Sequence, residues 1–123
     1  MTDRRRWLVR LTESAETDFR DISRWTAGRF GAAQARIYAE TLSAAIESMS
    51  DGPRLAGAKT RNDIGRRVVT LHVARGGRKG RHFLICRATA QADPPVIDIL
   101  RLLHDSMDLQ RHLPPPPDNG EAG

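Results

Sequence analysis

The sequence predicts an α+β fold, in which an antiparallel helical hairpin packs on one face of a small, mainly antiparallel sheet of about four strands. Three observations lead to this prediction. Apolar residues in the first half of the chain recur at steps of three and four, which is typical of helices. In the second half, β-branched residues and a period near two predict strands. Strands gathered after a helical hairpin favour two layers, with the helices on one face of the sheet.

A short strand and a capped helix open the chain. Residues 7–11 mix apolar and basic side chains and predict the strand. Thr12 is a good N-cap, and Glu13 and Glu16 follow it near the positive end of the helix dipole. Gly31 can end this helix in a left-handed conformation. The apolar residues at helical spacing are Ala15, Phe19, Ile22, Trp25 and Phe30.

A second helix follows and stops at Gly52 and Pro53, which are C-terminal signals. The short join around Gly31 makes the two helices an antiparallel hairpin, each arm about 25 Å long at about 1.5 Å per residue. Their apolar stripes need a common surface to cover. The stripe of the second helix comprises Ala35, Tyr38, Leu42, Ala45 and Met49.

Three strands are predicted after the hairpin, over residues 68–73, 83–87 and 96–103, and the turn-rich segments between them predict an antiparallel meander. The first of these strands places Val69, Leu71 and Val73 on one face. The last is almost continuously apolar, which predicts a place inside the sheet. We expect the N-terminal strand beside it.

A short helix is predicted to begin at His104, with Asp105 and Asp108 near its N-terminus. The chain of 123 residues is long enough for one domain with one core, which we place at residues 1–113. Residues 114–123 are rich in proline and polar residues and predict a disordered tail.

The basic charge is concentrated in one part of the sequence. The net charge is +5, yet residues 12–51 hold seven acidic and four basic residues, whereas residues 59–87 hold nine basic residues and one acid. Such a block predicts a polyanionic partner, either a nucleic acid or an acidic protein segment. A solvated hairpin rich in arginine is the alternative.

We expect a cytoplasmic protein without a membrane span. Cys86 is the only cysteine, which excludes an intramolecular disulfide and gives no sign of an oxidising compartment. The basic start has too few apolar residues for a signal peptide, and no apolar stretch approaches the length of a membrane span.

Common catalytic and metal-binding motifs are absent. The glycine cluster at 76–80 lacks the spacing of a phosphate-binding loop, and the four histidines lack metal-ligand spacing, so no cofactor or metal is predicted. His104 stands at the end of a predicted strand, where either a structural role or a place on a groove fits. Arg87 and Arg101 interrupt apolar strands, so each either pairs with an acid such as Asp98 or faces a ligand.

Several short motifs occur in an order that resembles the ParE branch of the RelE/ParE toxin superfamily over roughly residues 8–113. None is specific alone, but the ordered set is. The motifs are Pro53-Arg54-Leu55, Gly80-Arg81-His82, Arg87 near the end of its strand, Ile99-Leu100-Arg101, His104, Asp108-Leu109 and His112-Leu113.

The resemblance implies a toxin of a type II toxin–antitoxin system that arrests growth by trapping DNA gyrase on cleaved DNA. It also implies a ParD-like antitoxin, whose C-terminal segment wraps the toxin in a hetero-oligomer. The related RelE branch uses the same fold to cut messenger RNA in the ribosome, so an mRNA endonuclease is the second hypothesis. A degenerate binding module without toxicity is the third.

Two departures from the family stand out, and the first favours binding over catalysis. Cys86 stands where many relatives carry a tyrosine, and the only tyrosine, Tyr38, has a place in a helical stripe that predicts core packing. Residues 74–79 resemble an insertion. An endonuclease would use His104, Arg87 and Arg101. The candidate residues for binding the target or the antitoxin are Arg66, Arg67, Arg81, Arg87, Arg101 and His104.

Overall fold

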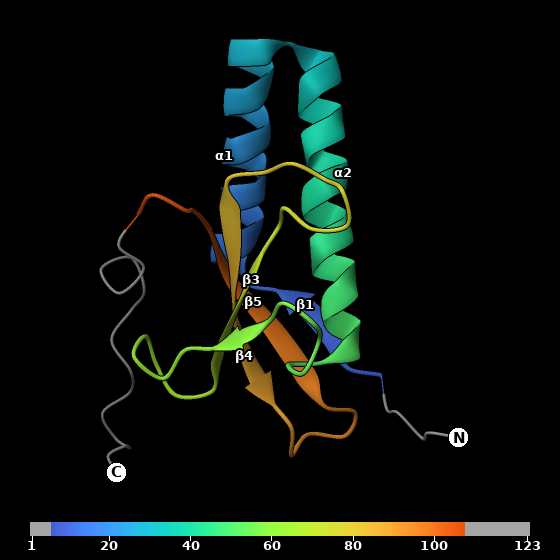
Figure 1. Cartoon of the computed structure of the whole chain (residues 1–123), viewed down its shortest axis with the longest axis vertical. Helices are drawn as coiled ribbons and strands as arrows, with labels where there is room; N and C mark the ends of the chain where they lie inside the picture. Colours follow the sequence, from blue (N-terminus) through green and yellow to red (C-terminus); the bar gives the residue numbers. More distant parts are fainter. Residues whose placement is uncertain (1–5, 108–123) are drawn as a thin grey trace.

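A computed structural model describes residues 6–107 of the chain (Figure 1). In order along the chain, the elements are β1 (Leu8–Leu11), α1 (Glu13–Phe30), α2 (Ala32–Ser48), the 3-10 turn η1 (Met49–Asp51), β2 (Lys59–Thr60), β3 (Val68–His72), β4 (His82–Thr89) and β5 (Val96–His104). None of the described helices is long and apolar enough to cross a membrane.

The strands form one mixed sheet in the order β1-β5-β4-β3-β2. β1 pairs parallel with β5, whereas β5, β4, β3 and β2 pair antiparallel in turn. The predicted α+β fold is confirmed, as is the position of β1 beside an interior β5. The sheet has five strands rather than about four, because the two-residue β2 is too short to leave a period in the sequence.

The helical hairpin is confirmed with Thr12 and Gly31 as the caps of α1, but Gly31 has a ψ of 164° and is therefore not in the left-handed helical conformation that was predicted. The Thr12 hydroxyl accepts a hydrogen bond from the backbone N–H of Ala15 at 3.2 Å and starts α1. Gly31 joins the two helices with a φ of 97°, which glycine adopts without strain. Gly52 follows η1 with a φ of 90°, and a Cβ atom there would lie 2.5 Å from the Trp7 ring, so a larger residue would displace the tryptophan.

The main core lies between the helical hairpin and one face of the sheet. Leu42 and Ala45 of α2 and Met49 of η1 are buried against the strands. Alternate strand residues face them, including Val69, Leu71, Val73, Leu84, Ile97 and Ile99. The opposite face holds a second buried cluster, formed by Val68, Ile85 and Leu103 with Ile64 and Phe83 packed against it. Burial on both faces explains why β5 is almost continuously apolar.

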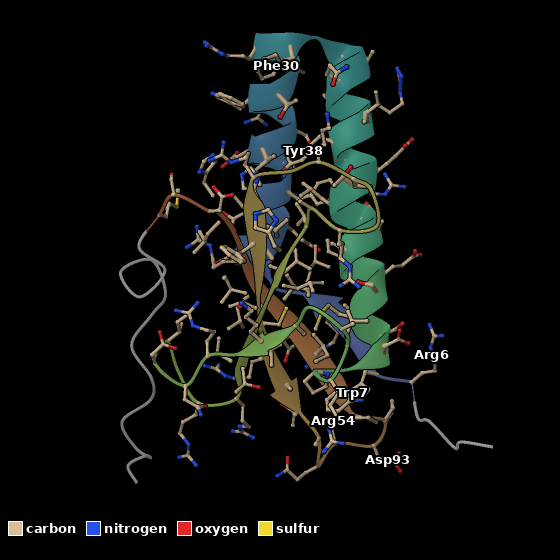
Figure 2. The ribbon with its side chains drawn as sticks, viewed as in Figure 1. Arg6, Trp7, Phe30, Tyr38, Arg54 and Asp93 are labelled. Atoms are coloured by element: carbon tan, nitrogen blue, oxygen red, sulfur yellow. The ribbon has the colours of Figure 1, made fainter. Side chains whose placement is uncertain are left out.

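The helical hairpin extends past one end of the sheet (Figure 1). The place of Trp25 and Phe30 in the apolar stripe of α1 had predicted that they cover the strands. They do not. Their exposed fractions are 62% and 60%, and their rings pack edge to face with centroids 5.9 Å apart. Ile37 of α2 is also exposed. We call Trp25, Phe30 and Ile37 the apolar tip; Phe30 is labelled in Figure 2.

The chain does not enter a helix at His104. Instead, His104 is the last residue of β5 and pairs with His82 of β4, and residues 105–107 form a turn closed by a bond from the Met107 N–H to the His104 carbonyl. The helix start was wrongly predicted because a cross-strand pairing extends β5. The rest of the predicted helix, at 108–113, and the predicted tail, at 114–123, lie outside the described residues.

Candidate functional site

The basic block divides into two groups at opposite ends of β3 and β4. Since the two strands are antiparallel, residues before β3 and at the end of β4 lie together, and the loop between the strands lies at the far end. The first group, the strand-start cluster, comprises Arg61, Arg66, Arg67 and Arg87, whereas Lys59 lies opposite Thr70 at the middle of β3. The second, the hairpin-loop cluster, comprises Arg75, Arg78, Lys79 and Arg81. The five residues of β3 separate them by roughly 13–17 Å.

The strand-start cluster is shaped by a turn of the backbone. Arg67 has a φ of 60°, and its carbonyl accepts a hydrogen bond from the Ala88 N–H at 3.1 Å, which holds the turn against the end of β4. Arg66 and Arg67 are exposed, whereas Arg87 is half-buried opposite Val68. Arg61 is bonded to the carboxylate of Asp63 at 2.7 and 2.9 Å, so part of the cluster's charge is neutralised.

Three of the four histidines meet at the other end of the sheet. His72 ends β3, His82 begins β4 and His104 ends β5. The rings of His82 and His104 are 5.3 Å apart between centroids and nearly perpendicular. Within residues 6–107, no group of three or more His, Cys, Asp or Glu side chains could hold a metal ion. His112 lies outside the described residues.

Backbone hydrogen bonds fix the neutral tautomer of His72 and His104. The backbone N–H groups of Ala74 and Ser106 donate to Nδ1 of His72 and His104 at 3.0 and 3.2 Å, respectively. Because these two Nδ1 atoms accept, each of the two rings, when neutral, carries its proton on Nε2. The Arg81 N–H donates to the Tyr38 hydroxyl at 2.9 Å, and that hydroxyl shares a hydrogen bond of 2.7 Å with Nδ1 of His82.

Asp105 neutralises part of this end of the molecule. Its carboxylate accepts a bond from Nε2 of His72 at 3.0 Å and from Nε of Arg81 at 3.2 Å. These two donors lower the pKa of Asp105 to about 2, so the carboxylate stays ionised.

Burial, with repulsion from His104, lowers the pKa of His82 to about 4, and burial raises the pKa of Tyr38. His82 therefore stays neutral and Tyr38 stays protonated near pH 7.

The chain resembles known toxins along most of its length. Residues 9–109 match the family described as the ParE toxin of the type II toxin–antitoxin system parDE. The chain belongs to the ParE toxin family. The toxin ParE of Escherichia coli is 32% identical over 103 residues, which cover 84% of this chain and 89% of that protein. Toxin ParE1 of Mycobacterium tuberculosis strain H37Rv is 30% identical over 103 residues, covering 84% and 94%.

A solved structure supports the ParE fold. A chain of the chromosomal ParDE toxin–antitoxin system from P. aeruginosa has a TM-score of 0.64 to this structure. It is 15% identical, and the match covers 80% of this chain and 95% of that chain. The resemblance predicted from the ordered motifs is thus confirmed for the family and for the fold.

The candidate residues of this ParE-family chain do not form one site. Arg66, Arg67 and Arg87 lie in the strand-start cluster, and Arg81 and His104 lie with the three histidines. The set predicted for an endonuclease, His104, Arg87 and Arg101, is not brought together, because Arg87 and His104 are near opposite ends of the β4–β5 pair.

The contacts of Arg101 join β5 to α1. Its Nε donates to the Asp18 carboxylate of α1 at 2.7 Å, and the same carboxylate accepts the Leu102 N–H at 2.9 Å. β1 pairs with β5 only as far as Ile99, so Asp18 satisfies a backbone donor on β5 beyond the end of β1. The sequence left two alternatives for Arg101, pairing with an acid or facing a ligand. In the structure Arg101 pairs with an acid, and that acid is Asp18. Asp98 instead binds Arg10, at 2.9 Å.

Sequence reasoning missed the assembly of Tyr38, His72, His82 and Asp105. A search for histidines at helical spacing could not find it, since each residue comes from a different element. One signal was available, because His72 and His82 flank the turn-rich segment 74–80 and a hairpin brings its flanking residues together. Tyr38 does pack against the core, as its stripe predicted, but its hydroxyl also belongs to the histidine network (Figure 2).

Proposed function

We propose that this toxin arrests growth by binding and inhibiting DNA gyrase in the cytoplasm, and that a ParD-like antitoxin neutralises it in a hetero-oligomer. The observation that carries the proposal is the match to the ParE family over residues 9–109, which includes both basic clusters. The sequence resemblance to ParE toxins implies this target and this partner. The solved relative also comes from a ParDE toxin–antitoxin system, which supports an antitoxin partner.

The charge distribution supports action by binding. Nine basic residues against one acid between residues 59 and 87 create a positive field on the sheet half of the molecule. A field of this kind accelerates encounter with a polyanionic or acidic partner. Gyrase holding DNA presents such a partner, and so does an acidic antitoxin segment.

For the antitoxin we propose an acidic and apolar segment that lies across the helical hairpin and the sheet. The apolar tip offers exposed aromatic and aliphatic surface of the kind that anchors a partner helix or strand. Arg66 and Arg67 offer exposed cations to the acidic part of the segment. Together they fit a partner that carries both kinds of side chain.

The target is tested by adding the purified toxin to gyrase and relaxed plasmid. Supercoiling is expected to stop in the presence of the toxin and to resume when the antitoxin is added in excess. Unchanged supercoiling would contradict the proposal.

Transcripts from induced cells are expected to stay intact. Translation-dependent cleavage that is lost on His104→Ala or Arg87→Ala would indicate the endonuclease instead. Absence of growth arrest without the antitoxin would indicate a non-toxic module.

The antitoxin surface is tested by reversing charge at Arg66 and Arg67. Association measured by stopped flow is expected to slow and to become less sensitive to salt, because fewer cations steer the acidic segment. Arg78→Glu with Lys79→Glu makes the same change in total charge at the far end of β3 and is the matched control. If the control slows association as much as the Arg66 and Arg67 variant, the strand-start cluster is not the docking surface.

A further inference from the structure

We propose that the hairpin loop and the adjoining histidine network form a site for the phosphodiester backbone of a nucleic acid. The donors are the side chains of Arg78, Lys79 and Arg81 and the Nε2–H of His104. This goes beyond inhibition of gyrase through protein contact, and either proposal can fail while the other holds. The loop in question is the β3–β4 connection, which runs across α2 in Figure 1.

The first argument is the chemistry of the groups presented. Guanidinium and ammonium groups only donate hydrogen bonds, and a phosphodiester only accepts them. His104 accepts from Ser106 through Nδ1, which leaves the Nε2–H of a partly exposed ring to donate outward. The half-buried His82, which pairs with His104 across the strands, stays neutral near pH 7. The surface is thus matched to an anion that has no donors of its own.

The second argument is the positive charge that remains at the loop. Among the described residues, Asp105 is the acid that forms an ion pair with the hairpin-loop cluster, through Arg81, and it also binds His72. Arg78 and Lys79 are exposed, and Arg78 makes a neutral contact with the Thr41 hydroxyl at 3.4 Å. In the strand-start cluster, by comparison, Arg61 is bonded to Asp63. Each cluster thus has one cation paired with an acid, and at the loop end Arg78 and Lys79 keep their positive charge.

The third argument is that the loop is held in place. The Arg78 N–H closes a turn onto the Arg75 carbonyl at 3.0 Å, with Gly76 and Gly77 at positive φ between them. A Cβ atom on Gly80 would lie 2.5 Å from the Val73 side chain and 3.0 Å from the Tyr38 hydroxyl, so the chain lies close against both residues. The loop backbone therefore needs little further ordering when its side chains bind an anion.

Nucleic acid fits this surface better than an acidic and apolar peptide does. A peptide of that kind also needs exposed apolar surface, and among the described residues three of the five exposed large hydrophobic side chains belong to β1 and α1, which do not form the loop: Leu8, Trp25 and Phe30. Among the described residues, only Met107 is near the histidines in the chain. We therefore assign the loop end to phosphates and the apolar tip to the protein partner.

The test measures binding of the purified toxin to fluorescent 20-nucleotide probes by anisotropy over a series of salt concentrations. The probes are duplex DNA and single-stranded RNA, and polyglutamate of similar charge is the competitor. Arg78→Ala with Lys79→Ala is expected to weaken binding about tenfold at low salt. It is also expected to reduce the slope of log K against log salt by about 2 for the duplex, since two phosphate contacts are lost. The preferred probe identifies the source of the phosphates.

Arg66→Ala with Arg67→Ala is the matched control, because it removes the same charge from two exposed residues at the other end of the strands. It is expected to change affinity and slope less. His104→Ala is expected to weaken binding, because the phosphate loses the Nε2–H donor. The proposal is overturned if neither probe binds, if the control weakens binding as much, or if polyglutamate competes as well as nucleic acid. Supercoiling assays on the same variants separate this result from the proposed inhibition of gyrase.

Discussion

Replacing Asp18 with alanine is expected to destabilise the fold, because one carboxylate supports both a helix–strand ion pair and a strand backbone. Asp18 accepts bonds from two nitrogens of Arg101 at 2.7 and 3.0 Å and from the Leu102 N–H at 2.9 Å. The Asp18 side chain is only 13% exposed, so water replaces it poorly. In the variant, the Leu102 N–H loses this acceptor at a part-buried position.

The magnitude follows from these contacts. An unpaired buried N–H costs about 1–3 kcal/mol, and a bond to a charged group contributes about 1.5–3 kcal/mol. Since the Arg101 side chain is 31% exposed and solvent screens part of its charge, the lower end applies to the ion pair. We expect Asp18→Ala to lower the free energy of unfolding by about 2–4 kcal/mol. At an m-value of about 2 kcal/mol per molar, the urea midpoint falls by about 1–2 M.

Asp21→Ala is the matched control, in the same helix and with the same gain in helix propensity. Asp21 meets Arg24 at 3.5 Å, and the two side chains are 62% and 77% exposed, so this pair is expected to contribute at most about 0.5 kcal/mol. Urea unfolding followed by circular dichroism measures both variants. Equal midpoints for the two would refute the structural role given to Asp18.

Four further substitutions test the histidine network and the packing. As pH falls from about 6.5 to about 4, the half-buried His82 resists protonation while the unfolded chain takes up the proton. Stability should therefore decline, and it should decline less in His82→Phe; NMR titration of the ring should show its midpoint near 4. Asp105, with its lowered pKa, should contribute stability above about pH 4 that is lost toward pH 2, and Asp105→Asn should remove that acid dependence. Gly80→Ala should cost about 1–3 kcal/mol through collision with Val73, whereas Gly28→Ala, with open space at its Cβ, should stabilise by about 0.5–1 kcal/mol, both measured by thermal unfolding.

Features set by short-range chemistry could be predicted from the sequence. Thr12 caps α1 through its own hydroxyl, and Gly31 joins the helices through its own backbone freedom, so each is visible without knowing the rest of the fold. The alternation of Val69, Leu71 and Val73 likewise predicts one face of β3, and all three lie in the main core. The interior place of β5 in the sheet followed from its apolar run.

Features set by strand register and by the relative lengths of elements could not be predicted from the sequence. Trp25 and Phe30 continue the apolar spacing of α1, but the helix extends beyond the sheet. The same apolar pattern therefore places these two side chains in solvent. The β4–β5 register shifts between Ile85 and Cys86, and no local pattern in the sequence indicates that shift. His72, His82 and His104 meet only because three strands end or begin at one level. The basic block is continuous in sequence and divided in space for the same reason.

Formation of trapped, cleaved DNA by gyrase tests the central claim most directly. Gyrase is incubated with plasmid and the purified toxin, then denatured and digested with protease, and linear DNA is quantified on a gel. Linear DNA is expected to accumulate with toxin concentration and to disappear when the antitoxin is added first. Plasmid that stays uncleaved at every toxin concentration, with the toxin folded and gyrase active, would contradict the assignment of gyrase as the target.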